Sequence, residues 1–175
     1  MERIHIIIGV IIFILFSAAA LADEVLTPDE RIIALTLLGE ARGEKTLGMY
    51  AVAAVIQKRS QNRKLTAAQV CLQPWQFSIW NAGKGKVKKE SELYYLWKSD
   101  CEVVHTARSY ARHLNRANGT LFFQLLTGHA DHYYSTDRKT PPYWTYKVTK
   151  KDNKEIKVPI APTKKIGKHI FYKLR

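Results

Sequence analysis

Two glutamates in the stretch LGEARGE, Glu40 and Glu44, are the first candidates for chemistry in this chain. Glu40 follows two leucines and a glycine at the expected end of an apolar helix, whereas Glu44 follows Gly43 and is expected to face water. Burial and the partial negative charge of a helix C-terminus both favour the protonated form of a carboxyl group. A protonated glutamate can donate its proton to a glycosidic oxygen while that bond breaks. Glu40 is therefore the candidate general acid, and the alternative is a solvated carboxylate at a frayed helix end.

Two stretches that combine aromatic rings with polar groups could bind a sugar polymer. The first is QPWQFSIWN at 73–81, and the second is the aromatic-rich stretch 132–144. Aromatic rings offer flat apolar faces, and amides and hydroxyls offer hydrogen bonds. The alternative is that these rings form part of the core, as we expect for Phe77. The side chains that we expect to contact a sugar are Gln76, Ser78, Trp80, His132, Tyr134 and Trp144.

Other common catalytic motifs are absent from the sequence. It has no HExxH, no CxxC and no paired Cys/His spacing of the kind that holds zinc. His129 and His132 lie close together, but no third ligand is evident beside them. The glycine-rich loops that bind phosphate and the GxSxG motif of serine hydrolases are also missing. We therefore expect no metal and no cofactor.

Charge and the N-terminus indicate an exported protein with a polyanionic partner. The formal net charge is +13, and the sequence pI is about 9.8. Residues 1–22 have the layout of a secretory signal peptide, with Arg3, an apolar run and a small-residue site that ends at Ala22. The alternative is an uncleaved anchor, although the apolar run is shorter than the roughly 20 residues of a membrane span. Export argues against a nucleic-acid partner, which would require a cytosolic chain, and favours an envelope polymer.

The two cysteines, Cys71 and Cys101, could form a disulfide in an oxidising compartment. Such a bond would stabilise the fold by roughly 3–4 kcal/mol in the chain-entropy model. The alternative is two free thiols that pack as small apolar groups. Both readings are open from the sequence.

Helix signals account for the first part of the chain. The capping box at 27–30 predicts a helix to about residue 40 or 42, so broadly apolar that it should be central in the core. Apolar spacing predicts a second helix over 46–59. Another capping box at 66–69 opens a short helix, and Pro74 makes 73–81 irregular. An apolar stripe predicts a long helix from about 91 to 115.

The rest of the chain has weaker and shorter signals. We expect a basic loop at 83–89 and an irregular aromatic loop at 128–144. Residues 146–149 alternate weakly, 151–154 are turn-like, and 165–172 read as a short strand or an ordered tail. The prediction is a mainly α, α+β single domain over 23–175. It has a central helix, irregular aromatic loops and a short C-terminal β element.

Several stretches, in this order, resemble the SleB-like cell wall hydrolases, the family of the spore cortex-lytic enzyme. They are GEARGE at 39–44 with AVAAVIQKR at 51–59, CLQPWQFSIWN at 71–81, ADHYYSTDRKTPPYW at 130–144 and KIGKHIFYK at 165–173. The resemblance implies a lysozyme-like fold related to lytic transglycosylases. It also implies cleavage of glycan strands between N-acetylmuramic acid and N-acetylglucosamine, with Glu40 as the essential residue. The chain looks most like the compact members from Gram-negative bacteria and their phages.

On this resemblance we expect a lytic transglycosylase that uses Glu40 first as acid and then as base. Its partner would be the peptidoglycan glycan strand. We also expect a monomer in the periplasm or cell envelope of a Gram-negative bacterium, or a phage-encoded enzyme, with transient membrane contact through its N-terminal signal. One alternative is an endolysin-type muramidase that uses water and a second carboxylate from Glu44, Asp131 or Asp137. Another is a wall-binding protein without catalysis. The basic stretch 150–164 has no assigned role.

Overall fold

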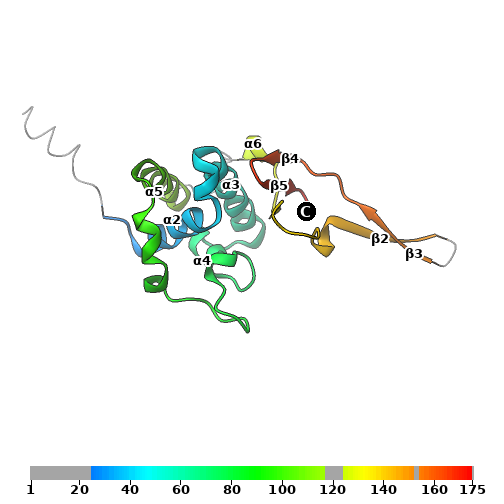
Figure 1. The fold of residues 1–175 in the computed structure, drawn as a ribbon, viewed down its shortest axis with the longest axis horizontal. Coiled ribbons are helices and arrows are strands. Elements are labelled where there is room, and N and C mark those ends of the chain that lie inside the picture. The colour runs from blue at the N-terminus through cyan, green and yellow to red at the C-terminus, as the bar shows by residue number, and fades with distance from the viewer. Residues whose placement is uncertain (1–24, 117–123, 152–153, 175) are drawn as a thin grey trace, which may run out of the picture.

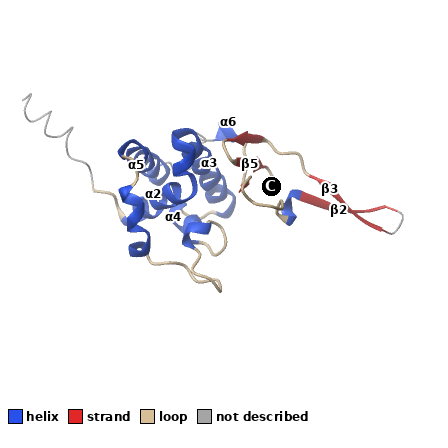
Figure 2. Ribbon diagram, viewed as in Figure 1, coloured by secondary structure: helices blue, strands red, loops and turns tan. Residues whose placement is uncertain are grey.

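Helices form one part of the molecule and short strands form the other (Figures 1 and 2). The computed structural model describes residues 25–116, 124–151 and 154–174, so the signal peptide expected over 1–22 lies outside them. The mixed α+β architecture that the sequence predicts is confirmed. Within the described ranges, no helix combines the length and the apolarity that a membrane crossing requires.

Helix α2 (Pro28–Ala41) is the central helix that the sequence predicts. Its capping box is complete, because Thr27 Oγ1 accepts the Glu30 amide at 3.3 Å and Glu30 Oε2 accepts the Thr27 amide at 2.9 Å. The helix packs against α3 (Lys45–Arg63), α4 (Ala67–Leu72) and α5 (Cys101–Arg116). It ends one residue after Glu40 and is followed by the 3₁₀ turn η1 (Arg42–Glu44).

Helix α3 extends beyond the predicted 46–59 at both ends, and it joins the two parts of the molecule. One side of it, with Val52 and Ile56, is buried in the helical core. The other side, with Ala51 and Val55, packs in a second cluster with Phe171 and other residues of the strand region. A single rigid element therefore supports both walls of the space between helices and strands.

The prediction of one long helix from about 91 to 115 is wrong, because the segment is broken in its middle. The structure has the 3₁₀ helix η3 (Glu90–Lys98), a break at Ser99 and Asp100, and then α5. Asp100 Oδ1 accepts the amide of Glu102 at 2.9 Å. An aspartate that caps a helix in this way begins a new helix and competes with continuation of the preceding one.

The short helix α4 begins with the predicted capping box between Thr66 and Gln69. The irregular stretch after it contains the 3₁₀ turn η2 (Ser78–Trp80). Residues 83–89 form the predicted basic loop, which a β-bridge between Asn81 and Val87 closes.

Strands β1 (His132–Ser135), β5 (His169–Tyr172) and β4 (Lys164–Ile166) form an antiparallel sheet in that order. The strand predicted near the C-terminus is thus confirmed, whereas the prediction of a loop throughout 128–144 is wrong. β1 pairs His132 with Tyr172, so its partner lies far along the chain and local sequence gives no sign of it. Helix α6 (Gln124–Thr127) precedes this sheet.

Strands β2 (Tyr146–Lys151) and β3 (Lys154–Pro159) form a separate hairpin that projects from the body of the molecule (Figure 1). The 3₁₀ turn η4 (Tyr143–Thr145) leads into it. The predicted turn falls partly on residues 152–153, which lie outside the described residues.

The two cysteines are free thiols, so the structure does not contain the disulfide that the sequence allowed. Cys71 is buried in the core on α4, whereas Cys101 is exposed to solvent at the start of α5. Burial raises the pKa of the Cys71 thiol to about 12, so this thiol stays protonated at neutral pH.

Candidate active site

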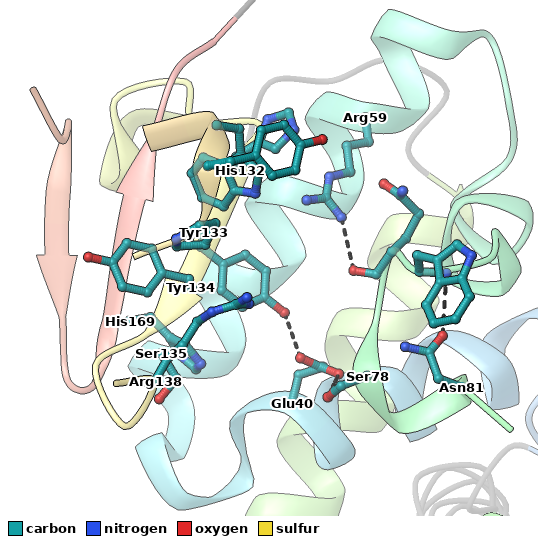
Figure 3. Close-up of a pocket in the computed structure, with 15 residues that line it drawn as sticks. Glu40, Arg59, Ser78, Asn81, His132, Tyr133, Tyr134, Ser135, Arg138 and His169 are labelled. Carbon is teal, nitrogen blue, oxygen red and sulfur yellow. Dashed lines mark hydrogen bonds between the residues drawn. The ribbon is translucent and has the colours of Figure 1, made fainter. Parts of the chain in front are cut away.

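Glu40 lies in a groove of about 690 Å³ between the helical part and the sheet (Figure 3). One wall comes from α2, α3 and the stretch after α4, and the other comes from β1, β5 and the segment that includes η4. The lining residues are Glu40, Arg59, Trp75, Gln76, Ser78, Asn81, His132, Tyr133, Tyr134, Ser135, Arg138, Pro142, Tyr143, Trp144 and His169.

The carboxylate of Glu40 accepts three hydrogen bonds from the two walls of the groove. Oε1 accepts from the Ser78 hydroxyl at 2.9 Å and from the Ile79 amide at 3.1 Å, and Oε2 accepts from the Tyr133 hydroxyl at 2.9 Å. A hydroxyl can donate to a carboxylate or accept from a carboxylic acid. Ser78 and Tyr133 can therefore hold the side chain of Glu40 in either protonation state.

Gly39 lets the turn η2 approach α2 closely enough for these contacts. A Cβ atom at Gly39 would lie 2.4 Å from Cγ1 and 2.7 Å from Cβ of Ile79. Such distances are far inside van der Waals contact. The glycine before Glu40 is thus a requirement of the site, because a side chain there would push the Ile79 amide away from the carboxylate.

Tyr133 is a hydrogen-bond donor that stays protonated. Burial raises its pKa well above the usual range, and the negative charge of Glu40 raises it further. Its ring packs against His169, with centroids 5.0 Å apart, and against Phe171 at 5.6 Å. This packing fixes the hydroxyl opposite Glu40 (Figure 3).

Arg59 ties the two walls together from beneath the groove. Its side chain is buried; Nε donates to the carbonyl of Asp131 at 2.8 Å, and Nη1 donates to the carbonyl of Gln76 at 3.4 Å. The guanidinium also lies over the ring of Phe77. Arg59 thus connects the stretch after α4 to the start of β1.

Five of the six predicted sugar-contacting residues line the groove, and Trp80 does not. Its side chain is 2 % exposed, and its Nε1 donates to Thr36 Oγ1 at 2.8 Å within the helical core. The turn η2 directs this ring toward α2 and not toward solvent. The prediction for Trp80 is therefore wrong, whereas Gln76, Ser78, His132, Tyr134 and Trp144 are brought together.

Several groove residues were not predicted from the sequence. Arg59 could have been found from the sequence, because it stands at a position that the apolar spacing of the second helix marks as buried. A buried charged side chain needs hydrogen-bond partners. His169 becomes part of the site because β5 pairs it with Ser135. Burial lowers the pKa of His169, so the ring is neutral at neutral pH. The other unpredicted residues include Asn81 and Arg138.

The three alternative carboxylates have different positions. Glu44 and Asp137 line a second cavity of about 350 Å³ that shares Glu40, Ser78, Ser135 and His169 with the groove. Glu44 Oε2 accepts the backbone amide of Lys168 at 3.1 Å, and Asp137 Oδ2 pairs with Lys168 Nζ at 3.2 Å. Asp131 is only 2 % exposed, beneath the groove. Across the described residues, no three side chains of His, Cys, Asp or Glu lie close enough together to hold a metal ion.

Asp131 is expected to act on stability, with a defined pH dependence. Burial acts to raise its pKa, but hydrogen bonds from His132 Nδ1 and from the Leu174 amide, each 2.9 Å long, outweigh it and leave the pKa lowered. A lowered folded-state pKa stabilises the fold above the unfolded pKa, and this stabilisation is lost as pH falls through the folded value. Asp131→Asn should therefore reduce the free energy of unfolding at pH 7 by about 2 kcal/mol.

Urea unfolding at neutral pH and at pH values below about 4 measures this effect, because an unfolded aspartate titrates near there. The difference between the variant and the unchanged protein should shrink in acid. Asp137→Asn is the matched control, because Asp137 is exposed and its loss should cost less than about 0.5 kcal/mol. A cost for Asp131→Asn that is the same at every pH would contradict the account.

Comparison with known proteins adds two findings. A family model described as Cell Wall Hydrolase matches residues 43–172. The crystal structure of the catalytic domain of the Bacillus cereus SleB protein is similar, with a TM-score of 0.50 and 25% sequence identity over 86% of this chain and 94% of that chain. No curated protein matches the chain in sequence. The family match begins just after Glu40, so the case for that residue comes from its geometry.

Proposed function

The chain belongs to the cell wall hydrolase family and acts on peptidoglycan, and from this premise we propose that it is a lytic transglycosylase. The bond cleaved would join N-acetylmuramic acid to N-acetylglucosamine, with Glu40 as the one catalytic carboxyl group. The observation that carries the proposal is the position of Glu40. Three donors from both walls hold it where the groove meets the second cavity, so that sugars can lie on either side of it.

In this mechanism one carboxyl group acts twice. Protonated Glu40 gives its proton to the glycosidic oxygen as the bond from that oxygen to C1 of the muramic acid breaks. The N-acetyl carbonyl of the substrate stabilises the positive charge that develops at C1. The carboxylate then takes the proton of the muramic acid 6-hydroxyl, whose oxygen bonds to C1. The product is a 1,6-anhydro end, Glu40 is protonated again, and no water is consumed.

Exposed aromatic rings on both walls support a sugar ligand. Trp75 is 66% exposed and Tyr143 is 90% exposed, and both line the groove. Large apolar rings left open to water at a groove are typical of binding sites. Gln76, His132 and Tyr134 would supply hydrogen bonds beside them.

The second candidate is a muramidase that hydrolyses the same bond with water. Glu44 and Asp137 favour it, since both line the cavity that adjoins Glu40. Both carboxylates, however, are already bonded to Lys168, and Asp131 is buried with bonds to His132 and the Leu174 amide. A water-positioning base would have to give up those bonds, so we prefer the transglycosylase.

Mass spectrometry of the muropeptides that the purified protein releases distinguishes the two reactions. A transglycosylase leaves anhydro ends, which are lighter by one water than the reducing ends that a hydrolase leaves. We expect anhydro ends throughout. Reducing ends would establish the muramidase instead, and Glu44→Gln and Asp137→Asn would then identify the second carboxylate.

Peptidoglycan as substrate implies that the enzyme works in the cell envelope. Within this frame we also propose export through residues 1–22 to the periplasm of a Gram-negative bacterium, transient membrane contact through that segment, action as a monomer, and a phage gene as an alternative origin.

A further inference from the structure

The hairpin of β2 and β3, which we term the basic arm (146–151 and 154–159), extends away from the rest of the structure (Figure 1). All six residues of β3 are exposed, and so are 147–150 of β2. No residue of the arm belongs to either core cluster of the described chain. An isolated two-stranded hairpin is marginally stable in water. A hairpin that projects without a core beneath it therefore indicates a surface that contacts another molecule.

Four of the ten exposed side chains in the described part of the arm are cationic. Lys147, Lys150, Lys154 and Lys157 are exposed, and Glu155 is the one acidic residue in the described part of the two strands. Four ammonium groups on one narrow hairpin repel one another and attract a polymer that carries repeated negative charges.

The register mixes charge and apolar groups on both faces of the arm. Val148 lies opposite Lys157, and Val158 lies opposite Lys147, and each such pair shares a face. A surface that inserts into a membrane gathers its apolar groups on one side and its cations on the other. The arm does not separate them, so its pattern fits an extended polymer with both anionic and apolar groups.

The base of the arm is fixed to the wall of the groove. The turn η4, which supplies Tyr143 and Trp144 to the groove, leads directly into β2. The Ile160 amide donates to the Thr145 carbonyl at 2.8 Å, and the buried Thr145 hydroxyl donates to the Pro142 carbonyl at 2.7 Å. A ligand that occupies the groove at Tyr143 is therefore beside the start of the arm.

We propose that the basic arm binds the carboxylates of peptidoglycan stem peptides near the glycan strand that occupies the groove. This inference rests on the proposed function and deepens it, since the groove holds sugar rings and the arm holds the anionic peptides attached to them. The arm makes the enzyme prefer peptide-bearing wall over bare glycan, and this preference weakens as salt screens the lysines.

The test compares a variant of the four arm lysines with a control that carries the same charge. Lys147, Lys150, Lys154 and Lys157 are changed together to glutamine, which keeps most of the side-chain length. The control changes Lys64, Lys84, Lys86 and Lys98, which are exposed and outside the arm and the groove lining. Binding to intact sacculi is measured by co-sedimentation in a Glu40→Gln background, and cleavage is measured on intact sacculi and on glycan strands from which the peptides were removed.

We expect the arm variant to bind sacculi about tenfold more weakly at low salt, with a smaller effect in high salt, whereas the control binds nearly as before. Cleavage of peptide-free strands should be unchanged. Equal weakening in arm and control variants, or an equal loss on peptide-free strands, would overturn the proposal. So would sacculus binding that stays intact while binding to phosphatidylglycerol vesicles is lost, which would indicate a membrane contact instead. If no form cleaves either substrate, the proposed function fails, while the co-sedimentation result still decides the role of the arm.

Discussion

Glu40→Gln is expected to reduce glycan cleavage by about 10³-fold while leaving the fold intact. General acid–base catalysis by one side chain contributes roughly 10²–10⁴-fold, and here a single group would serve both steps. Glutamine has the same shape; its amide oxygen can still accept hydrogen bonds from Ser78 and Ile79, and its NH₂ group can donate to the Tyr133 hydroxyl oxygen. The loss should therefore come from proton transfer and not from a displaced side chain.

Release of soluble muropeptides from purified sacculi measures the rate, and thermal unfolding checks the fold. Glu44→Gln is the matched control, since Glu44 lies one turn further along and its side chain bonds the Lys168 amide. It should keep most of the activity. A Glu40→Gln protein that retains a tenth or more of the original rate would show that another group is the catalyst.

Gly39→Ala should cost about 100-fold in activity, although the added methyl group touches no substrate. The new Cβ would collide with Cγ1 and Cβ of Ile79, which lie too near the backbone to move without it. The turn η2 would shift, and Glu40 would lose its bonds from the Ile79 amide and the Ser78 hydroxyl. A displacement of about 1 Å at a catalytic group can cost that much. Overpacking should also lower the free energy of unfolding by about 1–3 kcal/mol.

Gly43→Ala is the control for this prediction. It makes the same change four residues along, where a Cβ would meet nothing within 4 Å. Cleavage rates and urea unfolding of the two variants should separate clearly. Similar behaviour of both would mean that the close approach of η2 to α2 is not what positions Glu40.

Local signals in the sequence predicted the elements that depend on neighbours along the chain. The capping boxes at Thr27 and Thr66 fixed two helix starts, because each is closed by a residue three positions away. The predicted end of the first helix then placed Glu40 at the C-terminus of an apolar helix. The break before α5 was missed, although Asp100 carries a capping signal, because the apolar stripe continues across it.

Contacts between distant segments were beyond such reasoning. β1 exists because it pairs with β5, and Tyr133 reaches Glu40 only when that pairing is made. The direction of Trp80 depends on the packing of η2 against α2, so its aromatic character alone suggested a sugar contact that the fold does not allow. The amide and aromatic composition of the two stretches nonetheless predicted most of the groove, because both walls are built from them.

The burial of α3 on two sides has a consequence for how the protein unfolds. Val52 and Ile56 face the helical core, and Ala51 and Val55 face Phe171 and its neighbours. Loss of the small sheet would expose one side of α3, and loss of the helical core would remove the support of the sheet. Neither part can open far without the other, so the domain should melt in one cooperative transition. Glu40 and the Tyr133 hydroxyl opposite it are then held together or not at all.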